Sequence, residues 1–459
     1  MATPTPSSRH LFKSLARRYQ ARHLRLSELT SSLSYSSHHH QWPNNDHPIP
    51  ATLNLASKSS AHLPTTASLN TTAAFSFSTD ASTTSPINLE SPNCNIPPHI
   101  ADRVLLTPKL YQQPPHPLCT IKEKIETFFP GFDYVDSKDP IVKSTANFDS
   151  LLIPPDHVSR SKSDTYYVDH PDVCLRTHTS AHQLELLKQG HKEFLCTGDV
   201  YRRDDIDKSH YPIFHQMEGV KVFDLLPEGT MSDPEQNVEL VMEDLKKTLE
   251  GLAQHLFGPV ECRWVEEYFP FTHPSLELEI WYQDDWMEVL GCGVMQPKIL
   301  QDAGYDTTKH QAWAFGLGLE RLAMVLFEIP DIRLFWSQDE RFWNQFQPGE
   351  ITKFQPYSKY PPCFKDVSFW VDDAAAGDHE AAKNFHVNEL NDLLRQVGGD
   401  LIEAVELVDQ FTHPKTNRES HCYRITYRSM DRSLTNQEID ALQEQVRDKI
   451  SNQLNVELR

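Results

Sequence analysis

The stretch CTGDVYRRDDIDKSHYPIFHQMEGVKVFD, residues 196–224, decides the fold because it predicts two strands joined by a long polar loop. Apolar residues recur in both arms, 194–203 and 213–223. The loop between them, residues 202–211, holds two arginines, three aspartates, a lysine and a histidine. A hairpin tip of this composition also arises by chance, so its charge alone does not indicate a function.

The order of the side chains along this hairpin is more informative than its charge. Arg202 leads the loop, His210 closes it, and an aromatic residue follows at Phe214. Gln216 and Glu218 then lie on one face of the return strand, because side chains alternate between the two faces of a strand. Together these are the groups needed to hold a nucleotide beside an ammonium group.

Composition sets the outer limits of the interpretation. The chain has 459 residues, of which 39% are hydrophobic, so it is long enough for two to three domains. Its net charge of -21 argues against a protein that simply coats nucleic acid. The 8 cysteines form no CxxC pair, which predicts reduced thiols and no protein metal motif. Apolar runs all fall well short of the roughly 20 residues that span a bilayer, so we expect no membrane segment.

Residues 1–95 are predicted to be a mitochondrial transit peptide followed by a low-complexity spacer. The start is basic and amphipathic, and the first acidic residue is Glu28. A Ser/Thr/Asn/Pro-rich tract then runs from residue 31 to about residue 92 and cannot bury enough surface to fold. The alternative is a disordered basic tail. The first interpretation places the protein in the mitochondrial matrix.

Residues 116–136 predict a helix that runs into a strand. Pro117 suits a first helical turn, and the pair at 130–131, Pro-Gly, ends the helix. Further on, the tract 176–190 starts with small hydroxylated residues and becomes a second helix, with His178 and Ser180 at its mouth. A histidine beside a helix start is more often a capping residue than a substrate contact.

The region 262–300 is rich in aromatic and β-branched residues and predicts strands. Alternation puts Phe269 and Phe271 on the same side of a strand, and the proline between them favours a strand that lines a cavity. Core packing is the more common role of such a pair. Gly291 and Gly293 are expected to leave room for a ligand to approach the backbone.

The tract 310–333 predicts a strand, a glycine turn and a helix, with Arg321 in the first helical turn. The N-terminal end of a helix attracts phosphate, and an arginine beside it adds a permanent cation. The string GLGLER, residues 316–321, is therefore a plausible triphosphate contact. A solvated surface arginine is the alternative.

The last part of the chain predicts a linker, 337–357, and a separate domain, 358–459. The order of its expected elements, β-α-β-β-α-β, is ferredoxin-like. In the string HCYRITYR, residues 421–428, tyrosines and arginines fall on opposite faces of a strand. The predicted RNA-phosphate contacts, with solvated charges as the alternative, are Lys415, Arg418, Arg424, Arg428 and Arg432.

Three of these motifs resemble, in order and context, those of class II aminoacyl-tRNA synthetases. They are the helix and strand at 116–136, the loop at 202–214, and GLGLER. The strings RTHTS, FHQMEG, YFPF and AFGLGLER are similar to one family, the phenylalanyl-tRNA synthetases, over roughly residues 96–336. A single chain with a transit-like start and an extra C-terminal domain resembles their monomeric mitochondrial form.

The resemblance implies an α+β fold, with an antiparallel sheet flanked by helices in residues 96–336 and a ferredoxin-like anticodon-binding domain in residues 358–459. It implies that ATP, with Mg²⁺, activates phenylalanine to an adenylate. The phenylalanyl group is then transferred to the 2′-hydroxyl of the terminal ribose of mitochondrial tRNA(Phe).

The resemblance also implies how ATP is bound. Arg202 would grip the α-phosphate, His210 and Arg321 the outer phosphates, and Phe214 and Arg321 the two faces of adenine. Weaker candidates for magnesium or ribose contacts are Glu279 and Glu288. One departure is visible, because the family pattern Arg-x-Glu is Arg202-Arg203-Asp204 here, which leaves the role of Asp204 open.

The phenylalanine site follows from the same resemblance. Two residues would receive the α-ammonium group, two would lie along the amino and carboxyl groups, two rings would meet the phenyl group edge to face, and one small residue would leave the pocket floor deep. In that order they are Gln216 and Glu218, His178 and Ser180, Phe269 and Phe271, and Ala314.

Two rival interpretations remain. A class II enzyme for another amino acid, such as phosphoserine, would need cations where Phe269, Phe271 and Ala314 lie. A non-catalytic paralogue that binds RNA tends to lose its phosphate arginines, yet Arg202 and Arg321 are both present.

Overall fold

A computed structural model describes residues 87–225, 234–357, 360–371, 385–416, 418–454 and 456–459. The predicted transit peptide and nearly all of the predicted spacer lie outside the described residues. Packed chain begins before residue 96, however, because Ile87 and Ile96 are both buried in the largest hydrophobic core. The spacer therefore ends earlier than predicted.

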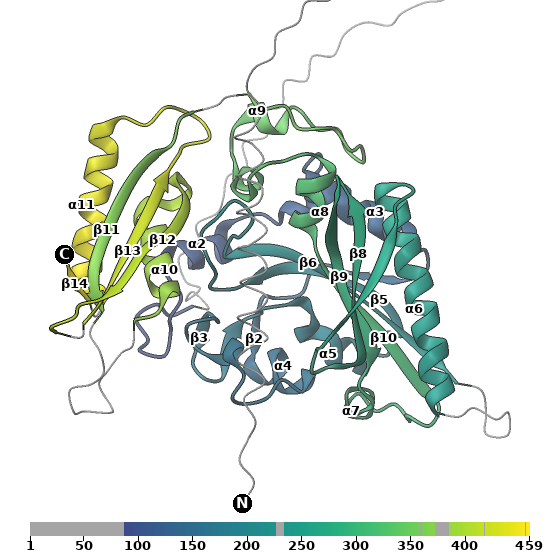
Figure 1. The fold of residues 1–459 in the computed structure, drawn as a ribbon. Coiled ribbons are helices and arrows are strands. Elements are labelled where there is room, and N and C mark those ends of the chain that lie inside the picture. The colour runs from purple at the N-terminus through teal and green to yellow at the C-terminus, as the bar shows by residue number, and fades with distance from the viewer. Residues whose placement is uncertain (1–86, 226–233, 358–359, 372–384, 417, 455) are drawn as a thin grey trace, which may run out of the picture. The chain divides into compact units, whose positions relative to one another are not determined.

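The N-terminal part of the described chain carries eight named α-helices around a central sheet (Figure 1). The helices are α2 (Pro98–Leu106), α3 (Pro117–Phe128), α4 (Ser144–Asn147), α5 (Gln183–Lys188), α6 (Pro234–Phe257), α7 (Pro297–Asp302), α8 (Leu319–Leu326) and α9 (Glu340–Trp343). The strands of the central sheet are β1 (Asp133–Val135), β5 (Glu193–Tyr201), β6 (Ile213–Asp224), β7 (Cys262–Glu267), β8 (Thr272–Tyr282), β9 (Asp285–Met295) and β10 (His310–Gly318). A small second sheet contains β2 (Ile141–Lys143), β3 (Tyr167–Asp169) and β4 (Val173–Leu175).

The central sheet has the strand order β1-β5-β6-β10-β9-β8-β7. All neighbouring strands are antiparallel except β1 and β5, which run parallel. The predicted antiparallel sheet flanked by helices is confirmed, with one parallel strand at its edge.

The predicted hairpin forms, and its register runs from Glu193 opposite Lys221 to Tyr201 opposite Ile213. Strand β6 also pairs with β10, down to Gln216 opposite Gly318. The glycines of GLGLER therefore lie within β10 rather than in a turn after it, and α8 begins at the next residue.

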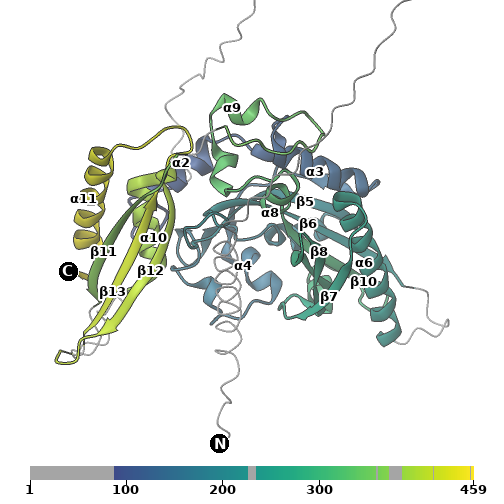
Figure 2. The same ribbon diagram turned by 45° about the horizontal axis from the view of Figure 1, so that its top comes forward.

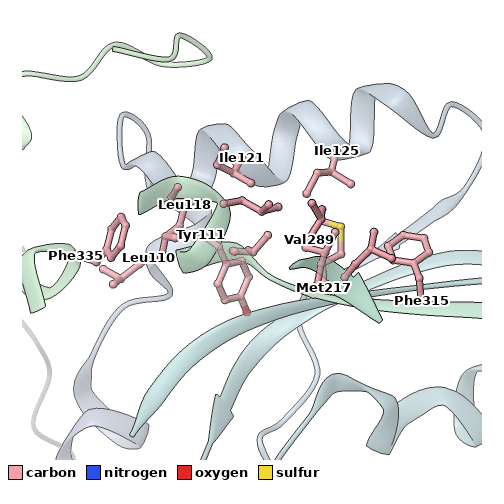
Figure 3. Packing of buried hydrophobic residues seen from close by; sticks show 14 of the residues in the cluster. Leu110, Tyr111, Leu118, Ile121, Ile125, Met217, Val289, Phe315 and Phe335 are labelled. Carbon is pink, nitrogen blue, oxygen red and sulfur yellow. The ribbon is translucent and has the colours of Figure 1, made fainter. Parts of the chain in front are cut away.

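Alternation along these strands divides the core into two layers. Helices α3, α6 and α8 pack on one face, where Ile121 and Ile125 of α3 lie over Met217 and Phe315 of the sheet (Figures 2 and 3). Helices α5 and α7 pack on the other face, against a separate cluster that includes Val220. Gln216 and Glu218 alternate with Met217, so they point to the α5 side of the sheet.

The C-terminal part forms a second unit of sheet and helices with its own core (Figure 1). Its elements are β11 (Cys363–Val371), α10 (Val387–Gly398), β12 (Ile402–Thr412), β13 (Glu419–Tyr427), α11 (Asn436–Gln453) and β14 (Val456–Leu458). The strand order β12-β13-β11-β14 confirms the ferredoxin-like prediction. Tyr423, Ile425 and Tyr427 share one face of β13, as alternation predicts, and this face packs into the core of the unit.

Two segments that were predicted to be polar connections are more tightly packed than expected. The predicted linker, 337–357, places Phe342, Phe346 and Phe354 in the core of the N-terminal part. The predicted polar loop, 202–211, places Ile206 in the core of the C-terminal part. In each case, apolar side chains within a polar tract pack into a hydrophobic core that is formed mainly by residues elsewhere in the chain.

The sheet predicts one sensitive glycine. A Cβ at Gly219 would come within 2.2 Å of Phe315 Cε1, its ring neighbour on β10. Gly219→Ala should lower the free energy of unfolding by about 1–3 kcal/mol, because overpacking forces the ring or the strand to move. Gly318→Ala, at a glycine with no atom near its Cβ position, should change it little in the same urea titration. Equal destabilisation by both substitutions would contradict the explanation.

Candidate active site

The leading arginine of the hairpin loop is held from the neighbouring segment. Arg202 Nε donates to the backbone oxygen of Thr177 at 2.9 Å, and its guanidinium carbon lies 5.1 Å from the centroid of the Phe214 ring. The side chain is solvent-exposed. It is thus positioned by one hydrogen bond and by a cation–π contact, with donors left to bind an anion.

A buried ion pair between Arg176 and Asp199 stabilises the segment that contains Thr177. Arg176 is fully buried, and it donates through Nε to the backbone oxygen of Asp199 at 2.7 Å and through Nη2 to Asp199 Oδ1 at 3.0 Å. Gly198 is required here, because a Cβ would come within 2.1 Å of Arg176 Nη2. This pair, which fixes the chain just before His178, could not be predicted from the sequence because its members lie on separate segments.

Polar side chains from three elements meet on the α5 side of β6. The backbone N–H of Thr179 donates to Gln216 Oε1 at 3.3 Å, and Gln183 Nε2 donates to Glu218 Oε1 at 3.3 Å. Among the described atoms, Glu218 Oε2 and both ring nitrogens of His178 are buried without a hydrogen-bond partner. Buried polar atoms are rarely left unpaired, so this group fits a small polar ligand.

Burial shifts the titration of this group. It raises the pKa of Glu218 to about 7, against hydrogen bonds from Ser180 and Gln183 that lower it. It lowers the pKa of His178 to about 3, helped by the positive charge of Arg202. The histidine is therefore neutral at physiological pH, while the carboxylate is poised to accept a cation.

The two phenylalanines lie together, but not on a strand. Phe269 and Phe271 fall in the connection between β7 and β8, with ring centroids 5.7 Å apart and an interplanar angle of 10°. The predicted strand was wrong here, since Pro270 interrupts the ladder between Glu267 and Thr272. Ala314 of β10 belongs to the cluster against which Phe271 packs.

The expected role of the two glycines of β9 was also wrong. A Cβ at Gly291 would come within 2.9 Å of Phe269 Cζ, and one at Gly293 within 2.4 Å of the backbone oxygen of Pro274. Protein atoms rather than a ligand use the space above these glycines. Gly291 thereby lets the Phe269 ring lie close to the sheet.

The proposed phosphate arginine, Arg321, lies in the first turn of α8. Arg321 is exposed, and its Nη1 lies 3.0 Å from Glu288 Oε2. Glu279 pairs with Arg263 and lies opposite Glu288 in the β8–β9 register. The structure therefore brings Arg321 and Glu288 together and gives Glu279 a different partner.

One further carboxylate on this surface was missed from the sequence. Burial raises the pKa of Glu277 to about 7, and the nearby charges of Glu288, Glu267 and Glu279 raise it further. The alternating string LELE, residues 276–279, carried the signal, because it places Glu277 and Glu279 on the same face of β8. Gln183, which donates to Glu218 and lies three residues after Ser180, was also not predicted as a site residue.

The other predicted loop residues have local partners. His210 Nδ1 lies 2.7 Å from Asp207 Oδ2, and this hydrogen bond raises the pKa of His210, which favours its charged form. Asp204 Oδ1 accepts from the backbone N–H of Asp205 at 2.9 Å. The backbone oxygen of Asp204 accepts from Arg395 Nη1 of α10 at 2.8 Å. Asp204 is thus a loop-shaping residue in this structure.

The five predicted RNA contacts lie on the C-terminal unit, and the four arginines are ion-paired. Their partners, in the order Arg418, Arg424, Arg428 and Arg432, are Glu457, Asp366, Glu403 and Glu438. Lys415 is exposed in the turn between β12 and β13. An RNA phosphate would have to compete with a carboxylate at each arginine.

Comparison with known proteins identifies the fold. Residues 101–346 match the family described as tRNA synthetases class II core domain (F), and residues 358–459 match the ferredoxin-fold anticodon binding domain. A chloroplastic/mitochondrial phenylalanine–tRNA ligase of Arabidopsis thaliana is 53% identical over 81% of this chain and 84% of the relative. The chain belongs to the phenylalanine–tRNA ligase family of class II synthetases.

Other members of the phenylalanine–tRNA ligase family are similarly close. The mitochondrial ligase of Mus musculus is 48% identical over 76% of this chain and 83% of the relative, and that of Saccharomyces cerevisiae is 41% identical over 74% and 86%. The phenylalanine–tRNA ligase alpha subunit of Prochlorococcus marinus matches only 50% of this chain, at 37% identity. The resemblance to the mitochondrial branch is confirmed. None of the helices in the described ranges is long and apolar enough to cross a membrane.

The raised pKa of Glu218 predicts how amino-acid binding depends on pH. Only the carboxylate attracts an ammonium group, so affinity for phenylalanine should rise roughly five- to tenfold from about pH 6 to about pH 7.5. Calorimetry without ATP measures this apart from Glu277 and His210. Glu218→Gln should bind weakly and without this pH dependence, and an unchanged pH profile in that variant would contradict the assignment.

The same shift predicts a stability effect of opposite sign. Glu218 binds its proton more tightly in the folded chain than at its ordinary pKa of 4.5. Its contribution to the free energy of unfolding is therefore greatest at low pH and is lost as pH rises through about 7.

Proposed function

We propose that this chain is a phenylalanine–tRNA ligase that forms phenylalanyl-adenylate from phenylalanine and ATP and then aminoacylates mitochondrial tRNA(Phe). The observation that carries the proposal is the buried carboxylate of Glu218, in which one oxygen has no hydrogen-bond partner. An α-ammonium group would satisfy that oxygen. The paired rings of Phe269 and Phe271 would then meet an apolar side chain.

In the first step a carboxylate oxygen of phenylalanine attacks the α-phosphorus of ATP, the bond to the bridging oxygen breaks, and pyrophosphate leaves. Arg202 would bind the α-phosphate, where its guanidinium would stabilise the charge that develops on the pentavalent centre. The amino-acid contacts, Gln216 and Glu218 for the ammonium group and His178 and Ser180 beside it, would hold the carboxylate in line.

The outer phosphates would lie at the loop and at the start of α8. His210 is favoured in its charged form by Asp207, and Arg321 would exchange Glu288 for phosphate oxygens. Adenine would lie between the Phe214 ring and the Arg321 guanidinium. Asp204 would act on the loop backbone rather than on adenine.

The clustered carboxylates fit a magnesium ion bound together with ATP. Burial and the nearby charges of Glu288, Glu267 and Glu279 raise the pKa of Glu277, and a bound cation would oppose that rise. In the described ranges no three His, Cys, Asp or Glu side chains form a metal cage, which suits an ion shared with phosphate oxygens. Glu277 and Glu288 would hold it, Glu279 would contribute more weakly, and the ion would neutralise phosphate charge.

In the second step the 2′-hydroxyl of the terminal ribose attacks the carbonyl carbon of the adenylate, and AMP leaves. The C-terminal unit would bind the anticodon, with contacts from the proposed set Lys415, Arg418, Arg424, Arg428 and Arg432. We further propose a monomer in the mitochondrial matrix, since the single chain carries both units and its relatives are named mitochondrial.

A phosphoserine enzyme is the second candidate, and the site disfavours it. A phosphate group would need cations where the Phe269 and Phe271 rings are stacked. The unpaired carboxylate of Glu218 would also repel a second anion.

Pyrophosphate–ATP exchange tests the activity directly. The wild type should exchange label only with phenylalanine present, and Arg202→Ala should lower kcat at least about 100-fold, because a charge contact to the transition state is lost. Arg341→Ala, at an exposed arginine that pairs with Asp339 and has no proposed contact to ATP, is the matched control and should retain most exchange. Exchange that does not depend on phenylalanine, or equal losses in both variants, would refute the proposal.

The depth of the pocket gives a second test. Ala314→Val should raise the KM for phenylalanine at least about tenfold, because two extra carbons enter the space proposed for the ring. Ala312→Val, two residues away on the same face of β10 and in the same cluster, controls for crowding of the core. An equal rise in both variants would indicate general overpacking instead.

A further inference from the structure

One carboxylate ties strand β6 to helix α8 behind the proposed nucleotide site. Glu320 lies in the first turn of α8 and is 3% exposed. Its Oε2 accepts a hydrogen bond from the backbone N–H of His215 at 2.8 Å, and its Oε1 lies 2.6 Å from His215 Nδ1. A single side chain therefore fixes both the backbone and the ring of one residue of β6.

This contact takes over where the strand pairing ends. The β6–β10 register reaches Gln216 opposite Gly318, and β10 becomes α8 at the following residue. His215 immediately precedes Gln216 on β6, one residue beyond the end of this pairing. Its backbone N–H donates to the side chain of Glu320 rather than to a strand. The start of α8 is thus held to β6 by a side chain.

Each member of this pair is the chain neighbour of a residue proposed to enclose adenine. Phe214 precedes His215, and Arg321 follows Glu320. Phe214 points to the opposite face of β6 from His215, because successive side chains alternate. A shift between β6 and α8 would therefore change the gap between Phe214 and Arg321 directly.

The surroundings of the pair make it rigid. The ring of His215 is stacked on Trp336, with centroids 5.8 Å apart and an interplanar angle of 25°, and it meets Tyr111 edge-on at 5.3 Å. His215 itself is 2% exposed. A hydrogen bond to a carboxylate in such surroundings is stronger and more demanding in geometry than one at the surface.

We infer that His215 and Glu320 are positioning residues that set the width of the adenine slot between Phe214 and Arg321. The inference rests on the proposed function, in which those two neighbours bind ATP. The pair acts through the strand and helix that carry them and does not touch the reacting atoms.

Two substitutions test the inference. His215→Phe keeps a ring between Trp336 and Tyr111 but removes Nδ1, and Glu320→Gln keeps the shape and one acceptor for the backbone N–H. Each should raise the KM for ATP about tenfold and leave the KM for phenylalanine within about twofold, because only the nucleotide walls move. Both constants come from pyrophosphate exchange. ATP affinity is also measured by calorimetry without phenylalanine.

The matched control is His116→Phe. His116 is fully buried, its Nε2 lies 3.0 Å from the backbone oxygen of Phe335, and its ring packs on Trp343. Losing this histidine should lower the melting temperature without changing the KM for ATP, because neither chain neighbour of His116 faces the nucleotide.

The inference is overturned if the two KM values rise together, if neither rises, or if His116→Phe has the same effect on ATP. If only Glu320→Gln folds, it decides the question. If neither variant folds, the pair is structural and the inference also fails. A wild type that binds ATP but lacks phenylalanine-dependent exchange would refute the proposed function alone, because calorimetry would still report on the slot.

Discussion

Strand β6 serves two environments at once, and the rest of the structure depends on that constraint. The side chains of Gln216 and Glu218 face the proposed substrate, while those of His215 and Met217 face the helices. A shift by one residue would exchange the two sets, burying two polar groups in the core. Pairing with β5 on one side and β10 on the other prevents such a slip.

Two carboxylates of the candidate site are not fully matched by protein groups. Deeper in the protein, charges are matched, as in the buried pair of Arg176 and Asp199. Along the proposed ligand path Glu218 keeps an unpaired oxygen and Glu277 lies among other carboxylates. Unpaired charge costs stability when it is buried, and a ligand of opposite charge recovers that cost when it binds. The site is in this sense incomplete without its substrates.

The hairpin and the ferredoxin-like unit could be predicted because their signals are local. Period-two alternation, a charged loop and the order of strands and helices need no knowledge of distant residues. The turn at Phe269–Phe271 could not, since alternation alone does not distinguish a strand from a short extended connection. Nor could the filling of the space above Gly291 by Phe269, because that depends on how β9 meets the turn.

The ion pairs of the C-terminal unit were unpredictable for a related reason. Arg424 meets Asp366 only because β13 and β11 pair in one particular register. The buried tie between His215 and Glu320 likewise joins residues far apart in the chain. In the candidate site, sequence patterns indicated the side chains that we propose to face a ligand, but not the buried residues that hold them in position.

The burial of Ile206 has a consequence for how the protein can be divided. This residue belongs to the hairpin loop, yet its side chain completes the core of the C-terminal unit, and its backbone oxygen accepts from Val405 of β12 at 3.0 Å. A C-terminal fragment that starts at residue 358 would lack Ile206, which is one of its core side chains. The complementary N-terminal fragment would expose that side chain. The boundary drawn along the sequence is therefore not the boundary of cooperative folding, and part of the energy that orders the loop is held in common by both units.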